Sequence, residues 1–162
     1  MFRLSARADP AFLTEMLYEA VYWRDDGAEE RPPLDAMLED PRIKGYVAGW
    51  GRAGDVALCA LDRREEPVGA AWYRRFTAAE PGYGFVAEDV PELSIGVYPE
   101  CRGQRIGSLL LGALLARARS SHERALSLSV SRENPAKRLY ARNGFEVVAQ
   151  PGDALTMLVD LT

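Results

Sequence analysis

The sequence predicts a mixed α/β fold in which helices cover both faces of one mixed sheet. Three observations predict it. Segments with strand-like and helix-like spacing follow one another in the order β, α, α, β, β, β, α, β, α, β, β. A charged turn joins two of the strands directly, as in an antiparallel hairpin, and residues 93–130 have the β–α–β order that is typical of parallel strands. All 162 residues are expected to form a single domain.

The N-terminal half is expected to supply three strands and one long helix. The helix begins at Asp9 and Pro10, an N-cap residue followed by proline at the first helical position, and apolar residues then recur at helical spacing. An acidic, irregular segment follows, with a short helix over Pro33–Leu38 and a further turn after Pro41. The expected strands are Phe2–Ser5, Asp55–Leu61 and Pro67–Phe76, the last two joined by the turn DRREE.

The C-terminal half is expected to alternate strands and helices. A helix over Gly103–Arg119 carries an apolar stripe, and a short helix over Pro135–Arg142 ends at Gly144, a residue type that favours helix C-termini. The predicted stripe consists of Ile106, Leu109, Leu110, Leu114 and Leu115. The expected strands are Leu93–Val97, Ala125–Val130, Phe145–Ala149 and Ala154–Leu161.

Composition excludes several classes of protein. A net charge of −4 and a pI near 5.1 argue against a nucleic-acid binder. The eleven-residue apolar run at 106–116 is too short for a bilayer, which needs about 20 residues, and the N-terminus lacks the apolar core of a signal peptide. Cys59, Cys101 and the single histidine, His122, offer no metal-binding pattern. We expect a soluble cytoplasmic protein with no metal.

The segment RGQRIG, residues 102–107, precedes the long helix. Helix N-termini leave backbone N–H groups without internal partners and carry partial positive charge, so they suit phosphates. Gly103 and Gly107 would allow close approach, and Arg102 and Arg105 add charge, although a basic loop without a ligand is the alternative. A Walker A loop is absent, and the GxGxxA match at residues 82–87 lacks the helix that a Rossmann motif requires.

Together with the later segment ENPAKRLYARNGFE, this loop resembles the GNAT superfamily of N-acetyltransferases. The acyl-CoA signature of that family is [QR]-x-x-G-x-[GA], and a later helix commonly reads N-x-A-x-x-L-Y-x-x-x-G-F. The matching positions are Arg102, Gly107, Asn134, Ala136, Leu139, Tyr140, Gly144 and Phe145. Arg105 stands where the family usually has its first motif glycine, and its side chain is expected to point away from a pyrophosphate.

The resemblance implies a mostly antiparallel sheet that is splayed between two central parallel strands, residues 93–97 and 125–130, where the pantetheine arm of acetyl-CoA inserts. Backbone groups near Val97 and Tyr98 would pair with the pantetheine amides. The backbone amides that would hold the pyrophosphate belong to Gln104, Arg105, Ile106, Gly107 and Ser108, beside Arg102 and Gly103. Asn134 would contact the cofactor, although it can also cap the helix that Pro135 opens.

The resemblance also implies two catalytic residues. Tyr140 matches the general acid that would protonate the departing thiolate, and the alternative is an aromatic ring that packs on the sheet. Glu92 lies where many members of the family have a glutamate that acts as a base, directly or through water. The alternative for Glu92 is an ordinary exposed carboxylate after Pro91.

The acceptor is expected to lie against the first two helices and the loop before residue 93. That region holds the acidic and aromatic residues Tyr18, Tyr22, Trp23, Asp25, Asp26, Glu29, Glu30, Asp35, Glu39, Asp40, Tyr83, Phe85, Glu88, Asp89 and Glu92. They suit a cationic amine, either a small molecule or a peptide, unless they are only solvated charges and core aromatics.

The sequence therefore predicts an acetyl-CoA-dependent N-acetyltransferase that works through a ternary complex. The alternatives are a non-catalytic acyl-CoA sensor of the same fold and a structural domain without a nucleotide ligand. Neither nucleic acid nor membrane is an expected partner, and a homodimer is expected only by analogy with the family.

Overall fold

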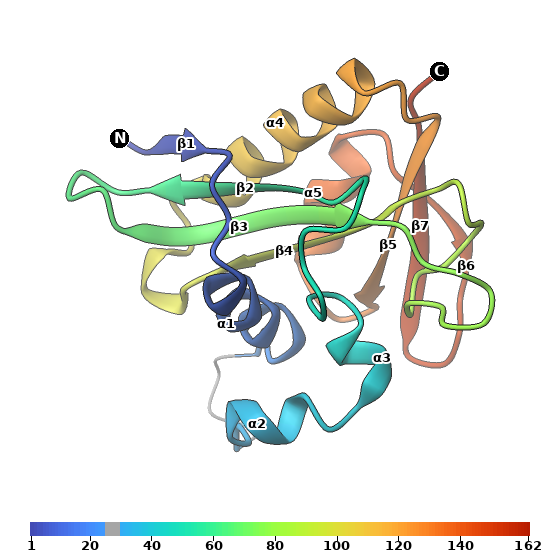
Figure 1. The fold of residues 1–162 in the computed structure, drawn as a ribbon, viewed down its shortest axis with the longest axis horizontal. Coiled ribbons are helices and arrows are strands. Elements are labelled where there is room, and N and C mark those ends of the chain that lie inside the picture. The colour runs from blue at the N-terminus through green and yellow to red at the C-terminus, as the bar shows by residue number, and fades with distance from the viewer. Residues whose placement is uncertain (25–29) are drawn as a thin grey trace.

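One seven-stranded sheet forms the centre of the protein in a computed structural model that describes residues 1–24 and 30–162 (Figure 1). The strand order is β1-β2-β3-β4-β5-β7-β6. The strands are β1 (Arg3–Ser5), β2 (Val56–Leu61), β3 (Pro67–Arg74), β4 (Glu92–Val97), β5 (Ala125–Ser131), β6 (Glu146–Ala149) and β7 (Ala154–Asp160). The order of elements and the mixed sheet confirm the predicted fold class.

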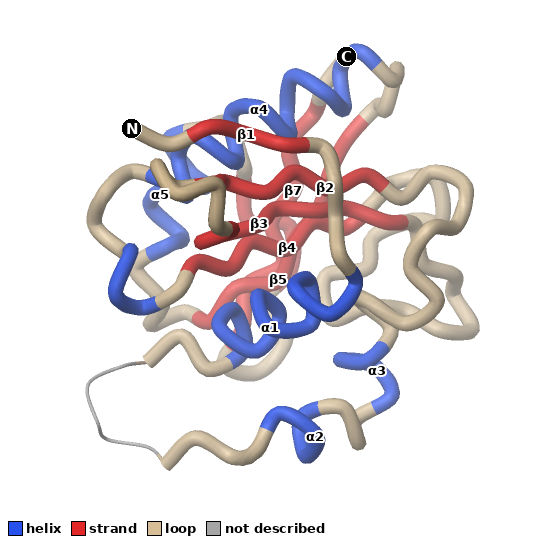
Figure 2. Tube along the Cα trace, turned by 60° about the vertical axis from the view of Figure 1, so that its left-hand side comes forward, coloured by secondary structure: helices blue, strands red, loops and turns tan. Residues whose placement is uncertain are grey.

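Helices cover both faces of this sheet (Figures 1 and 2). The helix α1 (Pro10–Val21) packs on β3 and β4, and the short helices α2 (Leu34–Met37) and α3 (Pro41–Lys44) lie on the same side as α1. The helices α4 (Ile106–Ser120) and α5 (Ala136–Arg142) pack on the opposite face, and a 3₁₀ turn, η1 (Pro99–Cys101), follows β4. Each face therefore has its own apolar core.

The sheet opens between β4 and β5, its one parallel pair of strands. These strands share a single register pair, Glu92 with Ser127, and the Ser127 N–H donates to the Pro91 carbonyl over 3.0 Å. Every other neighbouring pair is antiparallel, and the β3–β4 and β5–β7 pairs run the length of their strands. The expected splay between the two central parallel strands is thus present.

Gly96 sets how closely α1 approaches the splayed strand. A Cβ atom at this position would lie 2.1 Å from the carbonyl oxygen of Met16, inside the backbone of α1. Only glycine leaves room for this contact. The helix backbone consequently lies directly against β4, next to the opening in the sheet.

The start and the buried stripe of α4 differ from the prediction. The helix begins at Ile106 and not at Gly103, because Gly103 and Arg105 have φ angles of +80° and +65°, which no α-helix contains. Leu109, predicted in the apolar stripe, is 42% exposed. The buried side chains of α4 are Ile106, Leu110, Leu111, Leu114, Leu115 and Ala118.

Five predicted strands are shorter than expected. Three of them lack one terminal residue each, because β1 begins at Arg3, β2 begins at Val56 and β7 ends at Asp160. The strand predicted over Pro67–Phe76 ends at Arg74, and the strand predicted over Phe145–Ala149 begins at Glu146. Phe145 instead packs in the core, where its ring meets that of Tyr140.

Candidate active site

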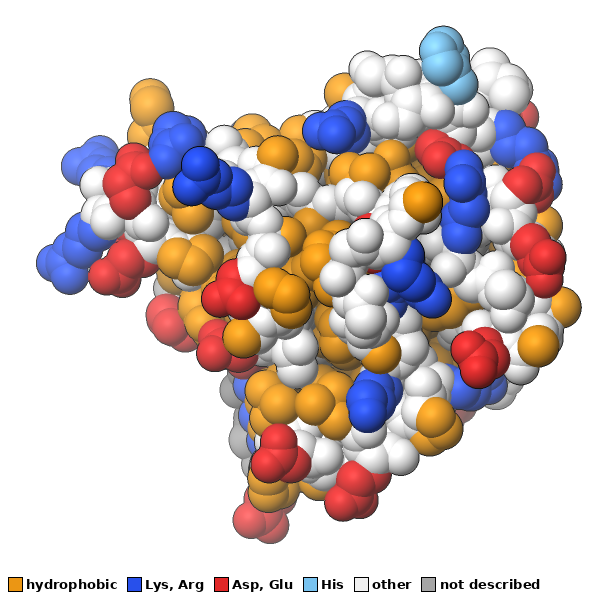
Figure 3. Space-filling model, in the orientation of Figure 1, with side chains coloured by type: hydrophobic (Ala, Val, Ile, Leu, Met, Phe, Trp, Pro, Cys, Tyr) orange, Lys and Arg blue, Asp and Glu red, His pale blue; other side chains and the backbone are white. Residues whose placement is uncertain are grey.

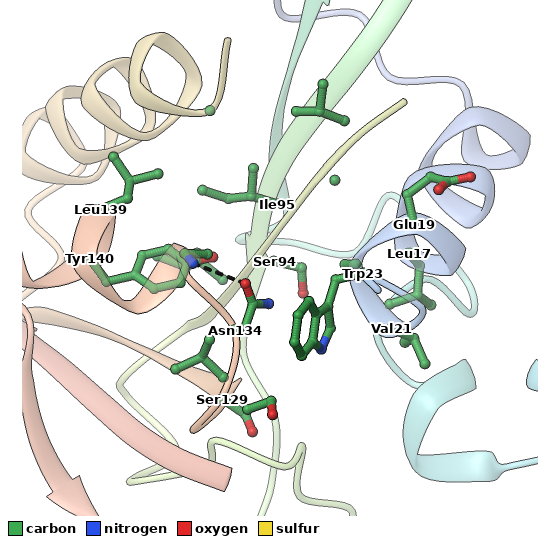
Figure 4. Close-up of a pocket in the computed structure, with 18 of the residues that line it drawn as sticks. Leu17, Glu19, Val21, Trp23, Ser94, Ile95, Ser129, Asn134, Leu139 and Tyr140 are labelled. Carbon is green, nitrogen blue, oxygen red and sulfur yellow. Dashed lines mark hydrogen bonds between the residues drawn. The ribbon is translucent and has the colours of Figure 1, made fainter. Parts of the chain in front are cut away.

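A cavity of about 770 Å³ occupies the opening between β4 and β5 (Figure 4). Its walls come from α1, the segment after α3, β4, the start of α4, the end of β5 and α5. The residues predicted for the site that line it are Glu92, Val97, Arg102, Gly103, Ile106, Gly107, Asn134 and Tyr140. The structure therefore brings the two predicted catalytic residues and most of the predicted cofactor residues to one cavity.

The edge of β4 has backbone groups that turn toward the opening. Tyr98 N–H donates to the carbonyl of Val68 on the β3 side, whereas the Pro91 carbonyl accepts from Ser127 on the β5 side. Because alternate residues of a strand direct their backbone groups to opposite neighbours, Ile95 and Val97 direct theirs toward the opening. The backbone of Val97 thus faces the opening, and its pairing with pantetheine stays a prediction, whereas the N–H of Tyr98 is already bonded within the sheet.

The N-terminus of α4 forms another wall. Leu109 N–H donates to the Arg105 carbonyl over 3.1 Å, so the N–H groups of Ile106, Gly107 and Ser108 precede the first internal bond of the helix. Ile106 and Gly107 line the cavity. Gln104, Arg105 and Ser108 are exposed beside it. This arrangement is what a pyrophosphate site requires, a helix end whose free amides meet solvent.

Arg102 joins this loop to α1. Its guanidinium donates hydrogen bonds to two backbone carbonyls, with N···O distances of 3.0 Å to Trp23 and 3.4 Å to Glu19. It also lies 3.6 Å from the Glu19 carboxylate. The guanidinium also donates to the Val97 carbonyl over 3.3 Å. The prediction that Arg102 pairs with phosphate is untested, and the contacts in the structure give it a second role, holding the loop against the C-terminal end of α1.

Glu92 lies at the base of the opening and is 1% exposed. Its Oε2 accepts hydrogen bonds from the Tyr46 phenol and, over 3.1 Å, from Gly84 N–H. Its Oε1 is buried next to Gly82 and has no hydrogen-bond partner. Burial raises the pKa of Glu92 to about 7, even though these hydrogen bonds and the charge of Arg42 act to lower it. The alternative of an exposed surface carboxylate is therefore wrong.

Tyr46 is a site residue that the sequence did not reveal. Its hydroxyl donates to Glu92 and accepts from Tyr83 N–H over 2.8 Å, and its carbonyl accepts from the Trp72 indole over 3.0 Å. Burial first, and then the Glu92 carboxylate, raise the pKa of Tyr46 well above its ordinary value, so it remains a proton donor. Both ends of this residue are fixed.

A buried ion pair fixes the chain on either side of Tyr46. The Arg74 guanidinium donates to the carbonyls of Gly45 over 3.0 Å and Ala48 over 2.7 Å. It also pairs with Asp55 over 2.7 Å, and both side chains are almost fully buried. Because a buried charge is stable only when it is paired and hydrogen-bonded, this arrangement holds residues 45–48 in one conformation.

Tyr140 lies across the opening from α1, and its ring points into the cavity (Figure 4). The ring also packs edge-on against Phe145, with centroids 5.8 Å apart. Burial raises the pKa of Tyr140 to about 12. Packing and a role as a proton donor are thus compatible for this residue, because the hydroxyl stays protonated at neutral pH.

Asn134 lies in the cavity between Tyr140 and Trp23 (Figure 4). Its side-chain oxygen accepts from Ala136 N–H over 2.9 Å at the start of α5. The capping alternative is therefore confirmed. A contact with the cofactor stays a prediction.

Only part of the predicted acidic and aromatic mouth lines the cavity. The lining includes Trp23, Tyr83 and Glu92. Several of the predicted acids are engaged elsewhere: Asp40 accepts from the Tyr83 hydroxyl, Glu88 from Ala78 N–H and Asp89 from Arg124. Those that do not line it are Tyr18, Tyr22, Glu30, Asp35, Glu39, Asp40, Phe85, Glu88 and Asp89, and Asp25, Asp26 and Glu29 lie outside the described residues.

Across residues 1–24 and 30–162, no cluster of three or more histidine, cysteine, aspartate or glutamate side chains is placed to hold a metal ion. Within the same ranges, no helix has the length and apolarity needed to cross a membrane.

A sequence model of the acetyltransferase (GNAT) family matches residues 8–145. The chain belongs to the GNAT acetyltransferase family. The match includes β4, the loop before α4 and all of α5, so the elements around the cavity are those of a GNAT domain. No curated protein matches this GNAT chain in sequence.

Solved structures of GNAT proteins share the fold over nearly the whole chain. The PaiA N-acetyltransferase of Thermoplasma acidophilum, in complex with coenzyme A, superposes with a TM-score of 0.71 at 17% identity and covers 99% of both chains. A GNAT superfamily phosphinothricin acetyltransferase of Sinorhizobium meliloti, in complex with acetyl-CoA, superposes with a TM-score of 0.65 at 24% identity. The match covers 98% of this chain and 88% of the acetyltransferase chain. An N-acetyltransferase of Staphylococcus aureus superposes with a TM-score of 0.65 at 17% identity, and the match covers 100% of this chain and 99% of the other.

Proposed function

We propose that this protein transfers the acetyl group of acetyl-CoA to a primary amine by direct attack in a ternary complex. The observation that carries the proposal is the buried Glu92 carboxylate, with its unpartnered Oε1, at the base of a cavity between splayed strands. The family is an acetyltransferase family, and two similar structures hold coenzyme A or acetyl-CoA.

The residues around the cavity fit acetyl-CoA. The free amides at the start of α4 suit the pyrophosphate, and the backbone of Ile95 and the N–H of Val97 face the opening, where the amides of the pantetheine arm would lie. When bound, acetyl-CoA would supply an activated thioester carbonyl. The cavity of about 770 Å³ leaves room for the arm of the cofactor and an acceptor together.

The chemistry needs a neutral amine. An alkylammonium has a pKa near 10.4, so removing its proton at pH 7 costs roughly 4–5 kcal/mol without a base. We assign this step to Glu92, which would take the proton directly or through one water molecule. With a pKa of about 7, Glu92 is both a base at neutral pH and an acid able to return the proton to solvent.

The nitrogen would then attack the thioester carbon, so that a C–N bond forms and the C–S bond breaks. The departing thiolate takes a proton from the Tyr140 hydroxyl, and Tyr140 regains one from the nitrogen of the new amide. The products are the acetylated amine and the free thiol of CoA, and the first ammonium proton remains on Glu92. Tyr140 suits this role because burial keeps its hydroxyl protonated.

The test is a thiol-release assay with acetyl-CoA and a panel of primary amines, combined with mass spectrometry of the amine. We expect thiol release that depends on the amine, with one acetyl group added per thiol. Thermal stabilisation by acetyl-CoA without release for any amine would contradict the proposal and support the sensor. No stabilisation at all would support the structural domain.

A further inference from the structure

The acceptor must reach Glu92 from the α1 side of the sheet. Gly96 contacts α1, and Glu92 lies four residues earlier in β4, so both turn to the same face. Leu93 faces the other way and packs with the core under α4 and α5. The nucleophile therefore passes along the wall of the cavity that α1 and the segment around α3 build.

Most side chains on that wall are apolar. They are Leu17, Ala20, Val21, Trp23 and Ile43, and the polar side chains beside them are Glu19, Arg24 and Tyr46. Figure 4 shows Leu17, Val21 and Trp23 together on the α1 side, and Figure 3 shows apolar side chains gathered in the hollowed middle of the face. An acceptor lying along this wall gains free energy by burying apolar surface.

The carboxylates that the described residues place on the cavity wall are both committed. Among residues 1–24 and 30–162, the lining contains two, Glu19 and Glu92. Glu19 lies 2.8 Å from the Arg31 guanidinium and 3.6 Å from that of Arg102. Glu92 serves as the base for the reacting amine. Within the described part of the chain, a diamine would therefore find no uncommitted carboxylate on the cavity wall for its second charge.

The cations on the wall are also committed. The lining of the same described ranges contains two arginines, Arg24 and Arg102. Arg24 is in an ion pair with Glu133, and Arg102 is bound by Glu19 and by backbone carbonyls. An acceptor that carries a carboxylate, such as an amino acid, would have to break one of these pairs to be neutralised.

From this balance of charge and apolar surface we infer that the acceptor is a monoamine with an uncharged, apolar body, such as an alkylamine or arylalkylamine. The inference rests on the proposed acetyl transfer and narrows its acceptor. It departs from the expectation of a cationic acceptor such as a polyamine, because three of the acids predicted to attract one, Asp40, Glu88 and Asp89, are bonded to other groups and do not line the cavity.

Three amines of one chain length test the inference on the wild-type protein. Hexylamine has a neutral body, 1,6-diaminohexane adds a second ammonium and 6-aminohexanoate adds a carboxylate. We expect kcat/KM for hexylamine to exceed that of each charged analogue by at least about tenfold, because a buried charge without a partner is costly. Equal or better turnover of either analogue overturns the inference and leaves the proposed function standing. No thiol release with these or other amines contradicts the proposed function itself.

A substitution that adds a carboxylate to the cavity wall tests whether the lack of a counter-ion disfavours the diamine. Ile43→Glu places an additional carboxylate on the apolar wall and should raise the ratio of kcat/KM for 1,6-diaminohexane over hexylamine by about tenfold. Val86→Glu is the matched control, because Val86 is 40% exposed and does not line the cavity. A ratio that Ile43→Glu leaves unchanged in a folded protein counts against the inference. If that variant does not fold, the wild-type comparison decides alone.

Discussion

The phenol of Tyr46 donates a hydrogen bond to Oε2 of Glu92, from a position 46 residues earlier in the chain. The bond joins the segment after α3 to the first residue of the splayed strand. It occupies one carboxylate oxygen and leaves Oε1 without a partner. Tyr46 thereby acts as a positioning residue, which holds the base in one orientation and opposes the effect of burial on its pKa.

Tyr46→Phe should shift the pH dependence of the reaction. The hydrogen bond from Tyr46 lowers the pKa of Glu92, as do Gly84 N–H and the charge of Arg42, so loss of the phenol raises that pKa above about 7. The acid limb of kcat/KM should then move to higher pH. Tyr18→Phe is the control, because the Tyr18 hydroxyl bonds to the Pro32 carbonyl away from the cavity. A limb at the wild-type position in both variants would show that Tyr46 does not tune the base.

Glu92→Gln should lower activity and should make the folded protein more stable above pH 7. The pKa of Glu92 is about 7 in the folded protein and 4.5 ordinarily, so the unfolded chain ionises first as pH rises. The group therefore destabilises the fold progressively from pH 4.5 to 7, by about 3 kcal/mol in total. Glutamine avoids this cost. Urea denaturation should show the variant to be more stable at pH 8 and nearly equal to wild type at pH 4. A variant that is less stable at pH 8 contradicts the burial argument.

Tyr140→Phe should lower kcat by about 10²-fold, a typical value for loss of a general acid. Phenylalanine retains the ring that meets Phe145, so the thermal midpoint and the KM for acetyl-CoA should change little. Steady-state kinetics and a thermal melt check this together. An unchanged kcat would leave Tyr140 with a packing role only.

The backbone at Arg105 predicts a difference between two substitutions. Arg105 has a φ of +65°, a left-handed conformation that costs a residue with a Cβ about 1–2 kcal/mol and glycine almost nothing. Arg105→Gly and Arg105→Ala remove the same charge. Because glycine loses more entropy on folding, the net advantage of Arg105→Gly in free energy of unfolding should be about 0.5–1 kcal/mol. Urea denaturation of both variants measures it, and equal stability would argue against the left-handed turn.

The order of strands and helices was predictable from the sequence because hydrophobic spacing and caps are local signals. Asp9 followed by Pro10 marks the start of α1 correctly, and its side chain accepts from Ala11 N–H. The start of α4 was not predictable from apolar spacing, because spacing does not show that Arg105 takes a left-handed φ, and the one hint was its place at a motif position that usually holds glycine. The burial of Leu109 was predicted wrongly for a related reason. Which residues of an apolar run are buried depends on where the helix begins and on the elements that it packs against.

Residues of the candidate site were predictable only where they belong to a sequence motif. Gly107, Asn134 and Tyr140 belong to such motifs, and all three line the cavity. Tyr46 has no local signal, because its role depends on contacts with β3, β4 and the loop at residue 83. The burial of Glu92 was also not predictable, because a glutamate that follows a proline is usually exposed and only the tertiary contacts bury this one.

The most direct test of Glu92 as the base is the pH dependence of amine-dependent thiol release from acetyl-CoA, compared between the wild-type protein and Glu92→Gln. We expect wild-type kcat/KM to rise with pH through a midpoint near 7, and we expect the residual activity of Glu92→Gln, at least about 10²-fold lower, to lack this limb. Wild-type rates with the same limb and magnitude in Glu92→Gln would contradict the assignment of Glu92 as the base.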